Sequence, residues 1–179
     1  MLDLIVIILY LLPPLYLFYL IVIYFVTKVP YATTPQEYYN TIFKNIKITK
    51  KTKVYELGCG KGKFLFEADK KFHPAELVGY DLSPLHIFYD KVKAKILKSK
   101  IKFYLQDFFK ADLRKADLIY LFLTPRSVKQ IWPKIKKETK KGARVVILSD
   151  GLPGVKYEKI IDMRPGKDHN SKLYIYKSA

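Results

Sequence analysis

Hydrophobic and polar positions divide this chain into two physically different parts. From Leu4 to Val26 the chain runs 23 residues with no charged side chain, and Leu, Ile, Val, Phe and Tyr dominate. A helix rises about 1.5 Å per residue, so such a run is long enough to span the roughly 30 Å hydrocarbon layer of a bilayer. The pattern therefore predicts one N-terminal transmembrane helix.

A signal peptide and a buried core helix fit this apolar run less well. A secretory signal peptide would need a basic first region, whereas Asp3 precedes the run and no Lys or Arg does. A buried core helix would need a larger protein around it. Pro13 and Pro14 remove two backbone donors in mid-run, which predicts either a kinked spanning helix or a re-entrant hairpin. Cations begin at Lys28, so the positive-inside tendency predicts a single-pass membrane protein with its C-terminal part in the cytoplasm.

Beyond the apolar run, short strand-like and longer helix-like patterns alternate. We predict strands over residues 53–57, 77–81, 101–105, 116–123 and 144–148, and helices over 63–72, 84–98 and 125–139. Repeated strand–helix units are typical of a parallel sheet with right-handed crossovers. Two last strands, over 158–162 and 172–176, predict a closing antiparallel hairpin.

Two predicted helices begin with capping signals. Thr34 precedes Pro35, and Glu37 follows three residues after Thr34, a pattern typical of a helix start. The apolar stripe of this helix is Tyr38, Tyr39, Ile42, Phe43 and Ile46. Ser83 before Pro84 predicts the start of a later helix. Its apolar positions are Leu85, Phe88, Val92, Ile96 and Leu97.

Charge and cysteine content narrow the classes of partner. The chain carries 33 Lys plus Arg against 16 Asp plus Glu, a formal net charge of +17, and one cysteine, Cys59. One cysteine excludes an internal disulfide, and with only three His it predicts no metal site. The charge suggests either nucleic acid or an anionic lipid surface as a partner. Only four cations are Arg, so forked groups for phosphate or base recognition are few, and we favour the lipid surface.

The strongest chemical signal is a glycine-rich segment between the first predicted strand and the helix that follows it. Gly58, Gly60 and Gly62 alternate there with Cys59 and Lys61. Glycines at such a turn let a ligand lie against the backbone, where a β-carbon would collide with it. The segment therefore predicts a binding loop.

An acid on the next strand indicates the class of ligand. Asp81 lies 21 residues after Gly60, where a carboxylate can accept hydrogen bonds from both ribose hydroxyls. The loop and Asp81 together predict a nucleoside-containing cofactor at the C-terminal edge of the sheet. A dinucleotide fits less well, because its fingerprint needs glycine where this chain has Lys63. Glu56, just before the loop, also suits a cationic amino group better than a pyrophosphate.

The pattern Glu-x-Gly-x-Gly-x-Gly over 56–62 resembles the S-adenosylmethionine site of class I methyltransferases. The resemblance implies an α/β fold with a Rossmann-like, mostly parallel sheet and an antiparallel C-terminal hairpin. It implies that the loop binds the methionine and ribose part, that Asp81 holds the ribose, and that an acid after the third strand approaches the adenine amino group. The implied cofactor-binding residues are Glu56, Gly58, Cys59, Gly60, Gly62, Asp81, Leu82, Gln106, Asp107 and Leu123.

A closer resemblance extends from about residue 30 to about residue 150. Its motifs are PYATTP at 30–35, the glycine loop, GYDLSP at 79–84, LQD at 105–107 and YLFLTP at 120–125. Their order is similar to that in the lysine methyltransferases that modify mitochondrial adenine nucleotide translocase and the ATP synthase c-subunit, with their prokaryotic relatives. This implies methylation of a lysine in a membrane protein. Two positions depart from the family: Lys61 replaces an acid, and Glu56 replaces the common Asp.

The sequence is expected to divide into three parts. They are an anchor over 1–28, a pre-loop segment with one helix over 29–52 and a methyltransferase domain over 53–179. Two alternative functions stay open: an RNA methyltransferase or RNA-binding module that uses the basic surface, and a non-enzymatic membrane-tethered domain. The intact glycine loop and Asp81 argue against the second of these.

Methyl transfer from a sulfonium is an in-line displacement, so catalysis consists mainly of positioning the two reactants. A lysine acceptor must be neutral, and desolvation in an apolar cleft lowers its pKa from about 10.4. Thr124 and Pro125 after the fourth strand, and Tyr31 before the loop, are the candidates for positioning the amine. Thr124 and Pro125 have an equally simple alternative role as the cap of the following helix.

Overall fold

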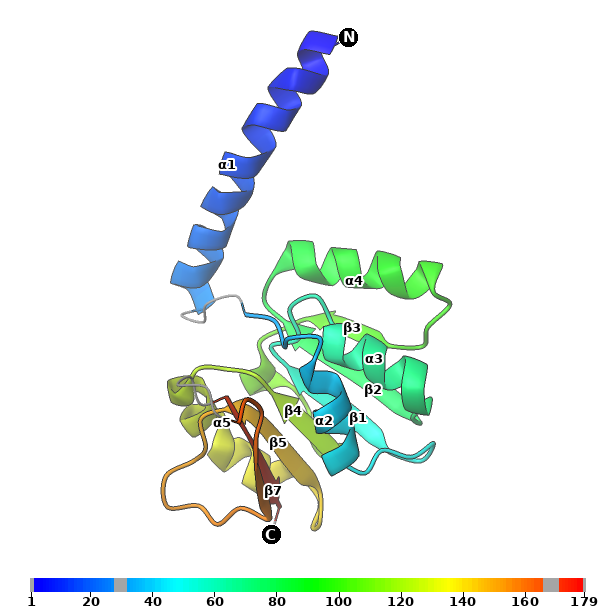
Figure 1. The fold of residues 1–179 in the computed structure, drawn as a ribbon, viewed down its shortest axis with the longest axis vertical. Coiled ribbons are helices and arrows are strands. Elements are labelled where there is room, and N and C mark those ends of the chain that lie inside the picture. Colours follow the sequence, from blue (N-terminus) through cyan, green and yellow to red (C-terminus); the bar gives the residue numbers. More distant parts are fainter. Residues whose placement is uncertain (1, 28–31, 166–170, 179) are drawn as a thin grey trace. The chain divides into compact units, whose positions relative to one another are not determined.

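The computed structural model describes residues 2–27, 32–165 and 171–178, and the chain forms two compact units, Met1–Tyr31 and Ala32–Ala179 (Figure 1). In the first unit, helix α1 (Leu2–Thr27) continues through Pro13 and Pro14 without interruption. The re-entrant hairpin is therefore wrong. The part from Ile5 to Phe25 has a mean hydropathy of 2.5 and is long enough to cross a membrane.

The second unit is built on one seven-stranded sheet with the order β3-β2-β1-β4-β5-β7-β6. The first five strands are parallel, while β7 runs antiparallel to both β5 and β6. This confirms the mostly parallel sheet with an antiparallel C-terminal hairpin. The strands are β1 (Lys53–Leu57), β2 (Glu76–Asp81), β3 (Lys102–Leu105), β4 (Leu118–Leu121), β5 (Arg144–Ser149), β6 (Lys159–Asp162) and β7 (Lys172–Lys177).

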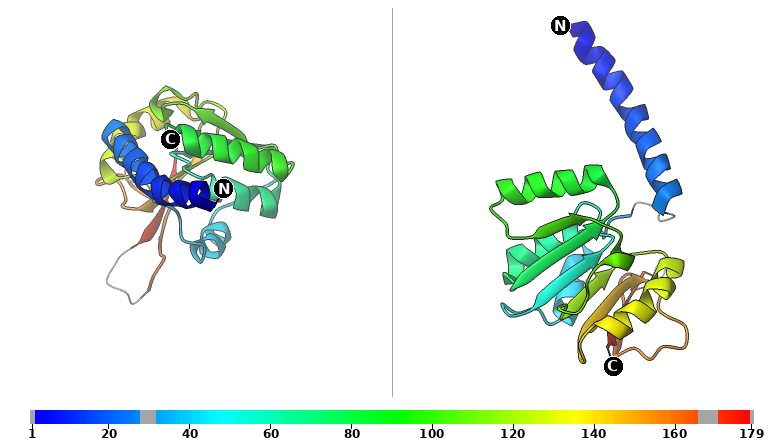
Figure 2. Two further views of the ribbon diagram at one scale, coloured as in Figure 1. Left: turned by 90° about the horizontal axis from the view of Figure 1, so that it is seen from above. Right: turned by 180° about the vertical axis from the view of Figure 1, so that it is seen from behind.

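Helices lie on both faces of this sheet (Figure 1; Figure 2). They are α2 (Tyr38–Asn45), α3 (Lys63–Phe72), α4 (Pro84–Ile96), the 3₁₀ turn η1 (Phe108–Lys110) and α5 (Pro125–Glu138). Helices α2 and α3 cover one face and α5 the other, which buries β4 and most of β5 from both sides. Continuous burial explains why these two strands are apolar at every central position.

The start of α2 differs from its prediction. The helix begins at Tyr38, after a turn in which the Tyr38 N–H donates to the Pro35 carbonyl at 3.1 Å. Thr34 does not cap it. Instead its Oγ1 shares a 2.7 Å hydrogen bond with the hydroxyl of Tyr120, because a buried tyrosine hydroxyl on β4 needs a polar partner. The predicted apolar stripe is confirmed, since all five of its residues are buried: Tyr38, Tyr39, Ile42, Phe43 and Ile46.

Helix α4 is capped as predicted, because Ser83 Oγ accepts the His86 N–H at 3.2 Å. It ends two residues earlier than predicted, at Ile96. Its apolar positions do not face the sheet. All five of them are exposed: Leu85, Phe88, Val92, Ile96 and Leu97.

Candidate functional site

The glycine loop leaves the end of β1 in a conformation that only glycine adopts without strain. Gly58, Gly60 and Gly62 have φ values of 75°, 52° and 56°. A Cβ at Gly58 would lie 2.6 Å from Leu123 Cδ2, and one at Gly62 would lie 2.7 Å from the Phe103 ring. Crowding from the protein itself is thus enough to require these two glycines, and the close approach of a ligand to the loop stays a prediction.

Asp81 ties this loop to the end of β2. Its Oδ2 accepts the Gly60 N–H and its Oδ1 accepts the Ser83 N–H, both at 2.8 Å. Each carboxylate oxygen can accept a second hydrogen bond, so Asp81 is fixed in position and still has acceptor capacity. The binding of ribose hydroxyls by Asp81 stays a prediction, and its position between the loop and β2 is compatible with it.

Glu56 is a buried carboxyl beside the loop. It is 6 % exposed, and its Oε2 has no hydrogen-bond partner among the described residues. Burial raises the pKa of Glu56 well above its ordinary value, and the charges of Asp90 and Asp81 raise it further, while the backbone N–H of Leu65 lowers it. A cation bound beside Glu56 would favour the ionised form and supply the missing partner.

An open pocket adjoins Glu56, and we name it the loop pocket. Its volume is about 310 Å³, counted out to its mouth. The pre-loop segment, α2, the glycine loop, α3 and the end of β4 all contribute to its wall. The lining residues are Ala32, Thr33, Thr34, Tyr39, Glu56, Gly58, Cys59, Lys61, Lys63, Phe64 and Phe122.

Asp90 of α4 is a second buried carboxyl group. It is fully buried, and neither carboxyl oxygen has a hydrogen-bond partner among the described residues. A Cβ at Gly62 would lie 3.2 Å from its Oδ2, so the group adjoins the loop. Burial raises the pKa of Asp90 to about 8, and Asp81 adds to the effect while Lys93 opposes it. Sequence reasoning missed Asp90, because an acid followed by Lys91 and Lys93 on a helix is typical of a solvated face.

Four further predicted cofactor residues lie around the same edge of the sheet. Cys59 is buried, and burial raises the pKa of its thiol, so it stays protonated. The Gln106 N–H donates to the Asp81 carbonyl at 3.0 Å, which joins the ends of β3 and β2. Leu82 is half-buried, and Leu123 is buried against Gly58. The structure thus brings these residues together.

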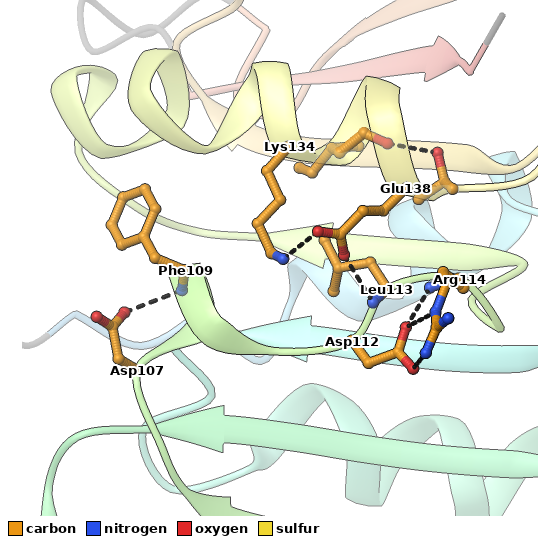
Figure 3. A network of polar contacts seen from close by, with 9 residues as sticks. Asp107, Phe109, Asp112, Leu113, Arg114, Lys134 and Glu138 are labelled. Atoms are coloured by element: carbon orange, nitrogen blue, oxygen red, sulfur yellow. Dashed lines mark hydrogen bonds and ion pairs between the residues drawn. The ribbon is translucent and has the colours of Figure 1, made fainter.

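Asp107 begins a segment that connects β3 to β4 without an α-helix (Figure 3). Its Oδ1 accepts the Phe109 N–H at 2.9 Å and caps η1. Farther along, Asp112 holds Arg114 through two side-chain hydrogen bonds of 2.8 and 2.9 Å. Glu138 of α5 accepts the Leu113 N–H at 3.3 Å and pairs with Lys134. These contacts fix the segment, and with it the position of Asp107.

The residues expected to position the acceptor amine lie elsewhere. Thr124 caps α5, since its Oγ1 accepts the Ser127 N–H at 3.3 Å, and Pro125 is the exposed first residue of that helix. Neither lines the loop pocket, so their capping role is the one observed. Tyr31 lies outside the described residues.

Sequence reasoning missed Phe122, which lines the loop pocket one residue before Leu123. The signal was present in the alternation of β4, because Tyr120 and Phe122 share one face of an extended segment. Tyr120 stacks on Phe64 with ring centroids 4.0 Å apart, and Phe64 also lines the pocket. Period-two reading of the motif over 120–125 would have added Phe122 to the candidates.

The sequence and fold of the chain are similar to those of known proteins. Residues 56–159 match the family described as the ANTKMT methyltransferase domain. The chain belongs to this family. The match covers more than half of the chain and contains the glycine loop, Asp81 and Asp107. The resemblance noted in the sequence is confirmed, and the chain is an S-adenosylmethionine-dependent methyltransferase.

Two curated relatives of the ANTKMT methyltransferase family are similar to this chain. The protein-lysine N-methyltransferase of Saccharolobus islandicus (strain REY15A) is 28% identical over 156 residues, which cover 85% of this chain and 95% of that protein. The ATP synthase c-subunit lysine N-methyltransferase of Mus musculus is 30% identical over 93 residues, 51% of this chain and 37% of that protein. The chain thus aligns with little more than a third of the mouse enzyme.

Solved structures share the fold. An RNA methyltransferase from Salinibacter ruber in complex with S-adenosyl-L-homocysteine superposes with a TM-score of 0.75 at 19% identity, covering 82% of this chain and 94% of that one. The N-methyltransferase NodS from Bradyrhizobium japonicum WM9 gives 0.63 at 15% identity, with coverages of 80% and 95%. Likeness at this identity establishes the class I Rossmann-like fold and nothing about the acceptor.

Proposed function

We propose that this methyltransferase transfers a methyl group from S-adenosylmethionine to the side-chain amine of a lysine in a membrane protein. The observation that carries the proposal is the loop pocket, in which the buried carboxyl of Glu56 lies among the aromatic side chains of Tyr39, Phe64 and Phe122. Such a wall suits cations and amines. The alignment with a protein-lysine N-methyltransferase over 95% of its length supports a lysine acceptor.

The cofactor is proposed to lie along the edge formed by the glycine loop, β2 and β3. The unpartnered Oε2 of Glu56 fits the cationic amino group of its methionine part, and the spare acceptor capacity of Asp81 fits its ribose hydroxyls. Gln106 and Asp107 would flank the adenine, with Leu82 and Leu123 as apolar walls. When bound, S-adenosylmethionine supplies an electrophilic methyl group.

The residues of the loop pocket would then prepare the acceptor amine. Tyr39, Phe64 and Phe122 exclude water, and desolvation lowers the pKa of a lysine that enters. Lys61 and Lys63 also line the pocket, and a nearby cation further disfavours the ammonium form. Lys61, which stands where the family usually has an acid, would therefore assist the loss of the acceptor's proton.

The membrane location is part of the proposal. Helix α1 would span the bilayer once and leave the methyltransferase domain in the cytoplasm, facing anionic lipid. The division into residues 1–28, 29–52 and 53–179 stays a proposal. The boundary between the two compact units falls between Tyr31 and Ala32 in the sequence, so α2 belongs with the catalytic unit. Relatives named for the ATP synthase c-subunit, a membrane protein, support an acceptor in the same membrane.

Labelled transfer to separated cell fractions tests this function. The full chain in detergent is incubated with tritiated S-adenosylmethionine and either washed membranes or total RNA. We expect the protein fraction of the membranes to gain at least about tenfold more label than with Asp81→Ala, because that variant cannot hold the cofactor's ribose. Label found only in RNA would overturn the proposal and favour the RNA methyltransferase.

A further inference from the structure

Helix α4 exposes most of its large apolar side chains. Leu85, Phe88, Tyr89, Val92 and Ile96 form one face of the helix, which we name the α4 stripe, and they are 48, 69, 47, 42 and 74 % exposed. The buried face carries Ile87 and Ala94 together with the polar residues His86 and Asp90. Large apolar side chains normally pack inward, so a contiguous exposed stripe marks a surface that something else covers.

The charges beside the stripe indicate what covers it. Lys91, Lys95, Lys98 and Lys100 are exposed on α4 and the turn after it. The one acid on the helix, Asp90, is fully buried and has a raised pKa. The outer face of α4 therefore combines large apolar side chains with cations and no anion. Helices of this composition lie in the interface of anionic bilayers, with apolar side chains among the acyl chains and lysines at the phosphates.

A second copy of the chain fits the stripe less well. Two α4 stripes facing each other would bring two sets of lysines together, in a protein that already carries +17. A bilayer is also the surface within reach. Only residues 28–31 separate α1 from the catalytic unit, so a membrane-spanning α1 would tether that unit at the lipid surface.

The stripe also adjoins the catalytic site. Lys61 lines the loop pocket, and its Nζ lies 5.9 Å from the centre of the Tyr89 ring. A surface that holds α4 against lipid would therefore hold the pocket close to the level at which the lysine of a membrane protein leaves the bilayer.

We propose that the α4 stripe inserts into the headgroup layer of an anionic membrane and holds the loop pocket at its surface. This rests on the proposed membrane location of α1 and adds a second, oriented contact. The contact involves no covalent step. It is stabilised by burial of the five apolar side chains of the stripe and by attraction between the lysines and the lipid phosphates.

Tryptophan quenching tests this contact in the full chain. Trp132 is the single tryptophan of the protein, so the Trp132→Phe variant has no tryptophan fluorescence and serves as the parent of two single-tryptophan probes. Phe88→Trp places an indole on the stripe. Tyr157→Trp places one at another exposed aromatic residue, 46 % exposed against 69 % for Phe88, away from α4. Each protein is reconstituted in vesicles of phosphatidylcholine with or without phosphatidylglycerol, using ordinary or brominated acyl chains.

We expect brominated chains to reduce the emission of the Phe88→Trp probe by about twofold or more in the anionic vesicles, and that of the Tyr157→Trp probe by far less. Equal emission from the Phe88→Trp probe in brominated and ordinary lipid would overturn the proposal. Equal quenching of both probes would also overturn it, since α4 would not orient the domain. Quenching that varies with protein density instead of bromine would identify a second copy as the occupant and overturn it too.

The failure of this contact is distinguishable from failure of the proposed function. Neither probe alters the glycine loop or Asp81, so both proteins are expected to bind S-adenosylmethionine like their parent. Labelling of membrane protein without quenching of the Phe88→Trp probe would reject the α4 contact alone. Quenching without any labelling of protein would reject the proposed function and leave the contact standing.

Discussion

Asp81→Ala is expected to weaken S-adenosylmethionine binding by at least about 100-fold. The variant removes acceptors for two ribose hydroxyls, and charge-assisted hydrogen bonds contribute about 1.5–3 kcal/mol each. It also frees the N–H of Gly60 and that of Ser83, which loosens the loop before the ligand arrives. Isothermal calorimetry on the full chain in detergent measures the effect directly.

Two further variants make the result specific. Asp81→Asn keeps one oxygen acceptor without the charge, so an intermediate loss is expected. Asp112→Ala removes an acid that contacts Arg114 on an exposed segment, and it should leave cofactor affinity within about twofold of the unmodified protein. If Asp81→Ala binds the cofactor as the unmodified protein does, the assignment of the ribose site is wrong.

The free energy of unfolding of the catalytic unit is expected to fall as pH rises from 5 to 8. The ordinary pKa of Asp90 is 3.8, and burial raises it to about 8 in the folded protein, so only the unfolded chain releases this proton in that range. The stability contributed by protonated Asp90 is therefore greatest at low pH and is lost as the pH rises to the pKa of Asp90 in the folded protein. Asp90 alone contributes a loss of about 3 kcal/mol across this range.

Asp90→Asn should flatten this pH dependence, because an amide does not titrate. A smaller slope is expected to remain, since burial raises the pKa of Glu56 in the same direction. Urea unfolding in detergent at pH 5 and pH 8, followed by the emission of buried Trp132, provides the measurement. Asp112→Asn is the control, as Arg114 lowers the pKa of Asp112 and keeps it ionised throughout. An unchanged slope in Asp90→Asn would contradict the assignment.

The sequence was sufficient for elements whose signals are local. The strand over 53–57 and the helix over 63–72 have the predicted bounds, because the glycines between them require a fixed backbone conformation. Ser83 caps α4 because its hydroxyl needs only a backbone N–H three residues away. Asp81 was found for a similar reason: the parallel sheet fixes where the end of β2 meets the end of β1.

The prediction for Thr34 failed because its side chain had two possible partners. Thr34 could cap a helix or satisfy the buried hydroxyl of Tyr120, and only the packed structure selects the second. Choices of this kind depend on residues distant in sequence, so one chain read by itself leaves them open.

The helix over 84–96 shows a further limit. Its predicted apolar positions have the spacing of a buried face, yet they face outward, while His86 and Asp90 pack inward with Ile87 and Ala94. Periodicity identifies the faces of a helix but not the neighbour of each face. A surface that a membrane covers looks the same in sequence as one that the sheet covers.

The identity of the methylated group tests the central claim most directly. Membrane protein labelled by the full chain with tritiated S-adenosylmethionine is hydrolysed in acid, and its amino acids are separated beside methylated standards. We predict that the label elutes with mono-, di- or trimethyllysine and that Asp81→Ala yields at least about tenfold less of it. Label in methylarginine, label released by mild base as methanol from a carboxyl ester, or no label in protein would contradict this claim.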